Sequence, residues 1–165
     1  MWLVGMMGVG KTSIGEKAAT ILGAPFYDTD WMVVEMTGKT IAEIWADRGE
    51  REFRDLERRA VEAVPIAGCL AAAGGGAVLQ RSNREQIRRG APVIWLDSDP
   101  ATLATRVGED GARPLLGDVL THGETLKSIL EERRPLYAEV STHVIEASDR
   151  PMDDLVGEVV ALWRR

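Results

Sequence analysis

Residues 1–12 read MWLVGMMGVGKT, a short apolar run that leads into the pattern G-x-x-x-x-G-K-[ST] at residues 5–12. The run Met1–Val4 predicts a buried strand, and the segment after the glycines predicts a helix. Glycines allow the backbone to wrap closely around a phosphate, whose oxygens then face successive N–H groups and the positive end of the helix. We therefore expect this loop to bind a nucleoside triphosphate, with Lys11 on the β- and γ-phosphates and the Thr12 hydroxyl on Mg²⁺.

Beyond this loop, apolar runs alternate with amphipathic segments, as is typical of an α/β domain with a parallel sheet. Strands are expected at residues 1–4, 25–27, 69–73, 92–96 and 142–145. Helices are expected at residues 11–22, 41–49, 50–64, 123–138 and 152–163, in a region after residue 30, and after Asp99-Pro100. This alternation predicts a three-layer α/β/α sandwich around a five-stranded parallel sheet. The 165 residues, 45% of them apolar, suffice for one domain, residues 1–165, and leave no room for a second.

Residues 108–123 are polar, rich in glycine and without periodicity. A loop of this length in a compact domain is usually functional, so we expect a mobile lid there. A lid favours a small-molecule kinase over a switch or a motor, because a kinase closes over the phosphates to exclude water.

Charge and composition exclude several classes of partner. Acidic residues outnumber basic ones by 26 to 20, a formal net charge of −6, whereas non-specific binding to nucleic acid or anionic membranes needs a basic patch. The single cysteine, Cys69, cannot form an internal disulfide and indicates a reducing compartment. Because no signal peptide or bilayer-spanning run is recognisable either, we expect a cytoplasmic monomer that binds neither nucleic acid nor membrane.

Two aspartates, Asp28 and Asp30, follow the second predicted strand. Ligands of open α/β sheets bind at the carboxyl ends of the strands. One carboxylate can hold Mg²⁺ through water while the other takes a hydroxyl proton from an acceptor. The alternative is that one of the two only caps the next helix.

Two more segments carry candidate acceptor contacts. Arg54 and Glu57 are three residues apart on a predicted helix and are therefore neighbours, although a solvated ion pair would give the same pattern. Residues 74–76, three glycines, follow the third predicted strand at the ligand edge. They would let a substrate lie on the backbone with its oxygens reaching N–H groups, and a loose turn is the alternative.

Taken together, these segments resemble the shikimate kinase family over nearly the whole chain. The resemblance depends on several motifs in order: GMMGVGKTSIG, DTD, TGKTIAEI through GEREFRDLE, GGG, RPLL at residues 113–116 and R-x-P-L-Y at residues 133–137. It implies a fold similar to nucleoside monophosphate kinases, with a phosphate loop at residues 5–12, a substrate-binding helical region at about 30–62 and a mobile lid at about 108–123. It also implies ATP-dependent phosphorylation of the 3-hydroxyl of shikimate, a step of aromatic amino-acid biosynthesis.

The resemblance further implies which residues bind the acceptor. In it Asp30 contacts the ring hydroxyls and is the catalytic base, and two arginines grip the carboxylate. The residues implied to hold shikimate are Asp30, Arg54, Gly75, Gly76 and Arg133. Arg134 is expected at the surface, because adjacent helical residues point about 100° apart and the family pattern has one residue between its arginine and the proline.

The nucleotide contacts follow from the same resemblance. Lys11 and the lid residue Arg113 are implied to be catalytic, the arginine offsetting the charge of the transferring phosphoryl group. One Mg²⁺ is assigned to Thr12 and Asp28. The residues expected to bind ATP are Gly8, Val9, Gly10, Lys11, Thr12, Ser13, Arg106, Arg113 and Pro151, of which Arg106 and Pro151 would flank the adenine.

Trp45 stands where the family usually has phenylalanine, so it is expected against the substrate pocket or in the core, while Met7 lies at the base of the loop. The other tryptophans, Trp2, Trp31, Trp95 and Trp163, are expected to be core or half-buried packing residues. Cys69 is expected in the core, and His122 and His143 lack the neighbours that a metal site needs.

Two other functions stay open. A small-molecule kinase of the same architecture, acting for example on gluconate or a nucleoside monophosphate, would keep the phosphate loop but need no carboxylate clamp from Arg54 and Arg133. A nucleotide-binding module that had lost its chemistry would show damage to Asp30 or Arg113, and both are present.

Overall fold

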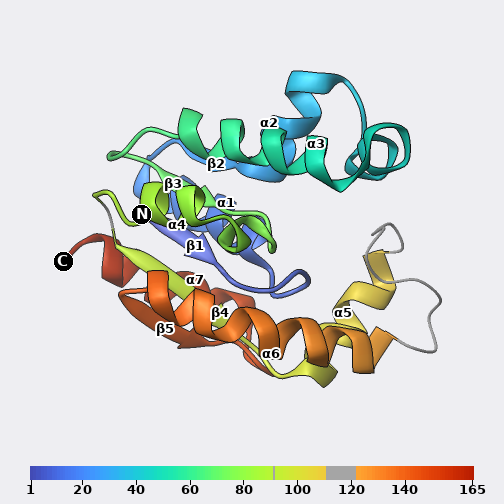
Figure 1. The fold of residues 1–165 in the computed structure, drawn as a ribbon. Helices are drawn as coiled ribbons and strands as arrows, with labels where there is room; N and C mark the ends of the chain where they lie inside the picture. The colour runs from blue at the N-terminus through green and yellow to red at the C-terminus, as the bar shows by residue number, and fades with distance from the viewer. Residues whose placement is uncertain (91, 111–121) are drawn as a thin grey trace.

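Five parallel strands form a single sheet in the order β2-β3-β1-β4-β5 (Figure 1). The computed structural model describes residues 1–90, 92–110 and 122–165. The strands are β1 (Trp2–Val4), β2 (Phe26–Asp28), β3 (Leu70–Ala72), β4 (Val93–Asp97) and β5 (His143–Glu146). The helices are α1 (Lys11–Leu22), α2 (Thr29–Thr37), α3 (Ile41–Ala63), the 3₁₀ turn η1 (Ala77–Leu79), α4 (Arg81–Ile87), α5 (Pro100–Asp110), α6 (His122–Val140) and α7 (Met152–Trp163).

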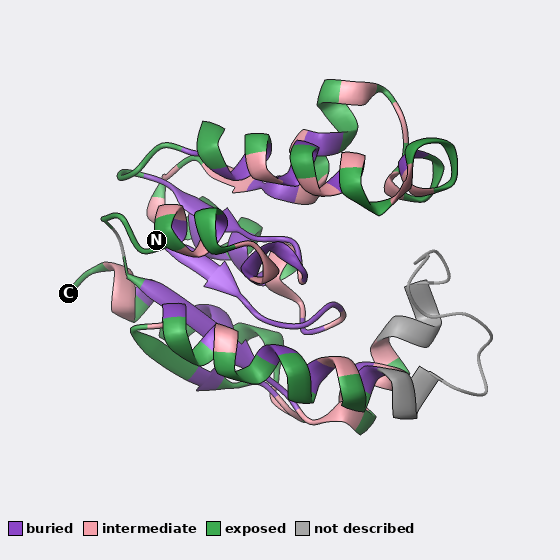
Figure 2. Cartoon of the chain, viewed as in Figure 1, coloured by how far each residue is buried: buried purple, intermediate pink, exposed green. Residues whose placement is uncertain are grey.

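Helices cover both faces of the sheet and confirm the predicted three-layer sandwich. α1 and α7 pack against each other on one face, and α4 and α6 lie on the other (Figure 1). β1 and β4 are buried along their whole length, as central parallel strands are, whereas β5 exposes three of its four residues at the edge (Figure 2). Within the described ranges, no helix combines the length and apolarity that crossing a lipid bilayer needs.

α2 and α3 lie beyond the β2 edge of the sheet and pack on each other around a small core of their own (Figure 1). The capping box predicted at the start of α3 is present: the Thr40 hydroxyl accepts from the Glu43 N–H, and the Glu43 carboxylate accepts from the Thr40 N–H. The predicted break at Gly49 is a kink, where the backbone has a φ of 75° and a ψ of 176°. These two features place the second half of α3 over the sheet edge.

Three details of the structure refine the expectations about the fold. Trp31, expected in the core or half-buried, is 48% exposed and therefore half-buried. The short helix α4 was not predicted, since its seven residues are mostly polar and Gln80 before it offers no cap. The predicted lid at about 108–123 falls mostly on residues 111–121, which lie outside the described residues, while residues 108–110 belong to α5 and residues 122–123 to α6.

Candidate active site

The loop between β1 and α1 carries its polar groups on the backbone. Gly10 is the N-cap of α1 with a φ of 95°, and no side chain caps the helix there. The N–H groups of the first helical turn are therefore available to an anion, which the helix dipole also favours. The Lys11 ammonium donates to the carbonyl oxygens of Gly5 at 2.8 Å and Met6 at 2.9 Å, and is thus held over the loop. The loop presents an ammonium group and a row of backbone donors, a surface suited to a chain of phosphates.

The remaining predicted nucleotide contacts of this loop differ in what they can offer. Gly8 has a φ of 79°, a conformation that favours glycine. Val9 is buried in the core, so only its backbone can face a ligand. Ser13 lies in the first turn of α1 with its side chain exposed.

Thr12 and Asp28 meet where α1 approaches the end of β2. The Thr12 hydroxyl donates to Oδ2 of Asp28 at 2.6 Å, while Oδ1 of Asp28 accepts from the N–H groups of Asp30 and Trp31 and caps α2. Asp28 therefore does cap α2, but only through Oδ1, and its Oδ2 stays beside the Thr12 hydroxyl, so capping does not exclude a metal contact. Among the described residues no cluster of three or more acidic, histidine or cysteine side chains forms a metal site. A hydroxyl and a carboxylate fit Mg²⁺, which usually keeps several waters and takes phosphate oxygens as further ligands.

Asp30 lies at the start of α2 against the glycine-rich segment, residues 74–76. The Thr29 hydroxyl accepts from the N–H of Gly74 at 2.9 Å and ties this segment to the end of β2. A Cβ atom on Gly74 would lie 2.5 Å from Oδ1 of Asp30 and 3.1 Å from Oε1 of Glu57. Glycine at position 74 therefore makes room for two carboxylates, a role that the sequence did not reveal.

Arg54 projects from α3 onto the same glycine-rich segment. Its Nη1 lies 3.0 Å from Oε2 of Glu57 and its Nη2 lies 3.1 Å from Oε1 of Glu50. The guanidinium packs against Gly76, where a Cβ atom would lie 2.5 Å from Nη1. Only 13% of the Arg54 side chain is exposed. Its neighbours hold the guanidinium in one place, which a solvated ion pair would not do.

Glu57 is the buried partner of this pair, with 1% of its surface exposed. Burial raises the pKa of its carboxyl to about 7, and the Arg54 guanidinium opposes that rise without cancelling it. The negative charge of Asp30 also contributes to the higher pKa. The charge beside Arg54 is therefore sensitive to pH near neutrality.

Arg133 and Arg134 are adjacent on α6 and point to different places. Arg133 is 5% exposed, and its Nε and Nη1 atoms are buried without a hydrogen-bond partner among the described residues. Arg134 instead lies 2.7 Å from Oδ2 of Asp97 and stacks over the Trp95 ring at 5.5 Å. Buried donors without partners are costly, so Arg133 is arranged for an anionic ligand.

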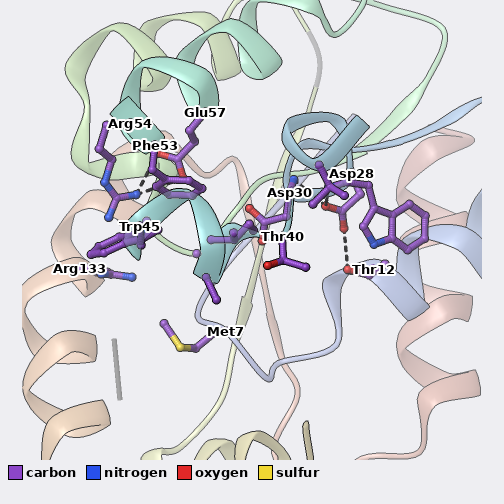
Figure 3. Close-up of a pocket in the computed structure, with 16 residues that line it drawn as sticks. Met7, Thr12, Asp28, Asp30, Thr40, Trp45, Phe53, Arg54, Glu57 and Arg133 are labelled. Atoms are coloured by element: carbon purple, nitrogen blue, oxygen red, sulfur yellow. Dashed lines mark hydrogen bonds and ion pairs between the residues drawn. The ribbon is translucent and has the colours of Figure 1, made fainter. Parts of the chain in front are cut away.

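One cavity of about 400 Å³ lies at the carboxyl edge of the sheet, and Arg54, Glu57 and Arg133 line it. Arg54 and Arg133 lie on one side of it, and Asp28 and Thr12 lie across from them with Asp30 between (Figure 3). The five predicted acceptor residues all border this cavity: Asp30, Arg54, Gly75, Gly76 and Arg133. Met7 and Trp45 border it as well. We call Arg54, Glu57, Gly76 and Arg133 the arginine wall.

The two residues expected to flank the adenine, Arg106 and Pro151, do not line the same hollow. Arg106 lines a second hollow with Asp99, Thr102 and Asp149, and its Nη2 lies 3.4 Å from the carbonyl oxygen of Ala147. Pro151, the residue before α7, is exposed and does not line this hollow. Arg113 lies outside the described residues.

Several residues that border the cavity were not predicted. Trp31 and Val34 of α2 line it although both are partly exposed, and Phe53 lines it next to Arg54. The position of Trp31 directly after Asp30 is a usable signal for this contact, whereas the general burial preference of tryptophan predicts only core or half-buried packing. Glu57 was seen only as a neighbour of Arg54, because burial cannot be read from helical spacing.

Comparisons with known proteins agree over nearly the whole chain. The family model described as shikimate kinase matches residues 7–163. A shikimate kinase of Symbiobacterium thermophilum is 43% identical over 164 residues, 96% of this chain and 92% of that protein. A shikimate kinase of Nostoc punctiforme is 35% identical over 161 residues, 97% of this chain and 88% of that protein. The solved structure of a shikimate kinase from Acinetobacter baumannii in complex with shikimate matches with a TM-score of 0.93 at 34% identity, covering 99% of this chain and 91% of that chain.

Proposed function

Because this chain belongs to the shikimate kinase family, we propose that it transfers the γ-phosphoryl group of ATP to the 3-hydroxyl of shikimate, giving shikimate 3-phosphate and ADP. The observation that carries the assignment is Arg133, whose buried Nε and Nη1 atoms have no partner in the part of the chain that the structure describes, and which borders the same cavity as Arg54. Two guanidiniums on one side of a cavity suit a carboxylate, since each offers a planar fork of donors.

On the donor side, the phosphate loop binds ATP through backbone N–H groups, and Lys11 contacts the β- and γ-phosphates. Its present contacts to loop carbonyls keep the ammonium close to where those phosphates would lie. Thr12 and Asp28 would hold one Mg²⁺, which when bound neutralises phosphate charge. Arg113 would add a further positive charge, as comparable arginines do elsewhere.

On the acceptor side, Arg54 and Arg133 hold the carboxylate and Gly76 offers a backbone donor. This fixes the ring so that a hydroxyl can lie between Asp30 and the phosphate loop (Figure 3). Asp30 accepts the proton of that hydroxyl as the bond to phosphorus forms. The reaction depends mainly on positioning and on charge, as phosphoryl transfer generally does.

Every described residue assigned to the site borders the loop, the cavity or the second hollow except Pro151. The proposed working form is a monomer. We place it in the cytoplasm because its single cysteine, Cys69, is a free thiol. Cys69 is buried directly before β3.

The decisive test is an acceptor panel in an assay that measures ADP release. Shikimate, gluconate and nucleoside monophosphates are compared at equal concentration, with a no-acceptor control for ATP hydrolysis. We expect ADP release with shikimate and none above the control with the other acceptors. Faster turnover of gluconate or of a nucleoside monophosphate would replace the proposed acceptor, and the absence of turnover with all of them would favour a binding module.

A further inference from the structure

The motif R-x-P-L-Y at residues 133–137 has a second end that the proposed function does not use. Its arginine lines the cavity, whereas its tyrosine, Tyr137, is fully buried. The Tyr137 hydroxyl donates a hydrogen bond of 2.6 Å to the carbonyl oxygen of Gly75. A residue of α6 thus reaches across to the glycine-rich segment after β3.

This bond acts on a peptide unit of the acceptor site. The carbonyl of Gly75 and the N–H of Gly76 belong to one planar trans peptide group, in which the two point in opposite directions. Holding the carbonyl on the Tyr137 side therefore holds the N–H of Gly76 on the other side. Both glycines border the cavity, so the orientation of this peptide decides where the backbone donor points.

Tyr137 also lies one helical turn after Arg133, on the same face of α6. Burial raises the pKa of the Tyr137 hydroxyl far above its usual range, and the nearby Arg133 guanidinium offsets only part of that rise. The hydroxyl therefore stays protonated and remains a donor at every pH at which the enzyme works.

A residue of the sheet packs against the ring of Tyr137. Trp95 of β4 stacks on it with ring centroids 5.9 Å apart and an interplanar angle of 29°. Arg134 lies over the same indole at 5.5 Å and forms an ion pair with Asp97, the last residue of β4. The side chain that does not face the cavity thus fixes the rotation of α6 about its axis.

We propose that Tyr137 is a positioning residue, which sets Arg133 and the N–H of Gly76 relative to one another so that both reach the same acceptor molecule. The proposal rests on the acceptor function proposed above. It assigns a role to a residue that has no contact with the cavity itself, and it connects two elements that the chain supplies about 60 residues apart.

The test is Tyr137→Phe in the full-length chain, which keeps the ring and its stacking and removes only the hydroxyl. The KM for shikimate should rise about tenfold, because the Gly75 carbonyl loses its partner and the peptide is free to turn. The KM for ATP should stay within about twofold of the wild type. Tyr27→Phe is the matched control, since Tyr27 in β2 is the other of the two tyrosines and does not border the cavity.

The split between the two KM values separates positioning from stability. An unchanged KM for shikimate, or a parallel rise of both KM values, would overturn the proposal while the proposed function stood. If the wild type did not phosphorylate shikimate at all, the proposed function itself would fail.

A second measurement does not depend on the folding of Tyr137→Phe. In the Tyr27→Phe chain, 3-fluorotyrosine labels Tyr137 alone, and its ¹⁹F resonance should shift on saturation with shikimate but not with ADP. A resonance that ignores shikimate, or that moves equally with ADP, would also overturn the positioning role.

Discussion

The phosphate loop and the arginine wall face each other across one cavity, and they satisfy their polar groups in opposite ways. In the loop, Lys11 already donates to two backbone carbonyls and Thr12 to a carboxylate, so each has an internal partner. In the wall, Arg133 buries two nitrogens that have no partner among the described residues. The partners of these loop side chains lie at most 16 residues away along the chain, whereas the wall is complete only when α3, α6 and the glycine-rich segment have come together.

The two regions should contribute differently to the specificity for donor and acceptor. Replacing an internal partner by a phosphate exchanges one set of interactions for another, while a carboxylate at the wall would give partners to the buried Nε and Nη1 atoms of Arg133. Acceptor choice should therefore depend on the wall, and donor binding on the loop. Variants in the two regions should change different kinetic constants.

The largest effect is expected at Asp30, which lies between the two regions. Asp30→Asn should lower kcat by about 10²–10⁴-fold, because an amide cannot accept the hydroxyl proton at neutral pH. ADP affinity, measured by calorimetry, should stay within about twofold because the loop is untouched. Retention of most of the wild-type kcat would contradict the proton-acceptor role.

The same contrast explains how much could be predicted from the sequence. The phosphate loop and the Asp28-Thr29-Asp30 segment are each one unbroken stretch of sequence. Their residue types and spacing therefore indicate the chemistry without knowledge of the fold. Arg54 and Arg133 are 79 positions apart, and helical periodicity alone did not choose between Arg133 and Arg134; a family pattern did. The burial of Glu57 depends on the elements that pack against α3, and a local sequence pattern carries no information about them.

The exposed tryptophan illustrates a second limit. Trp31 lies three residues after the capping Asp28, and its direction is decided by the first turn of α2 and by an edge-on contact with Phe26, the ring centroids lying 6.2 Å apart. Average burial preferences cannot supply that direction. For a similar reason, α5 continues as far as Asp110 through glycine and acidic residues that a local pattern assigns to a loop.

The next largest effect concerns the buried charge of the wall. The pKa of Glu57 is about 7 in the folded chain against an ordinary value of 4.5, so between these pH values the folded state binds more protons than the unfolded state. The contribution of Glu57 to the free energy of unfolding is therefore fully present below pH 4.5, where the carboxyl is neutral in both states. It is lost as the pH rises through 7. Relative to Glu57→Gln, the wild type should lose about 3 kcal/mol of unfolding free energy over this range.

Denaturant unfolding of both chains at pH 5 and pH 8 measures this loss. Taking the difference between them cancels the other carboxyls, several of which have shifted pKa values of their own. A difference that did not change with pH would show that Glu57 stays charged in the fold, and the wall would then resemble the loop in having its charges fully paired.

Arg133 and Arg134 test the wall by a pair of adjacent substitutions. Arg133→Lys should raise the KM for shikimate about 10–100-fold, because an ammonium group cannot offer the planar fork of a guanidinium. Arg134→Lys should change it less than about twofold, since a lysine keeps the positive charge opposite Asp97. Steady-state kinetics that gave the reverse order would exchange the roles of the two residues.

The smallest effect should come from one methyl group on the wall. Gly76 has a φ of −97°, which any residue can adopt, so Gly76→Ala adds no backbone strain and only moves the Arg54 guanidinium that packs against it. The KM for shikimate should rise about three- to tenfold, with the KM for ATP unchanged. Gly157→Ala in α7 is the control: a Cβ atom there meets no atom of the described residues within 4 Å, and the substitution should stabilise the helix by about 0.5–1 kcal/mol without changing either KM. If Gly76→Ala raised the KM for ATP instead, the glycine-rich segment would belong functionally to the phosphate loop, and the division between the two regions would have to be redrawn.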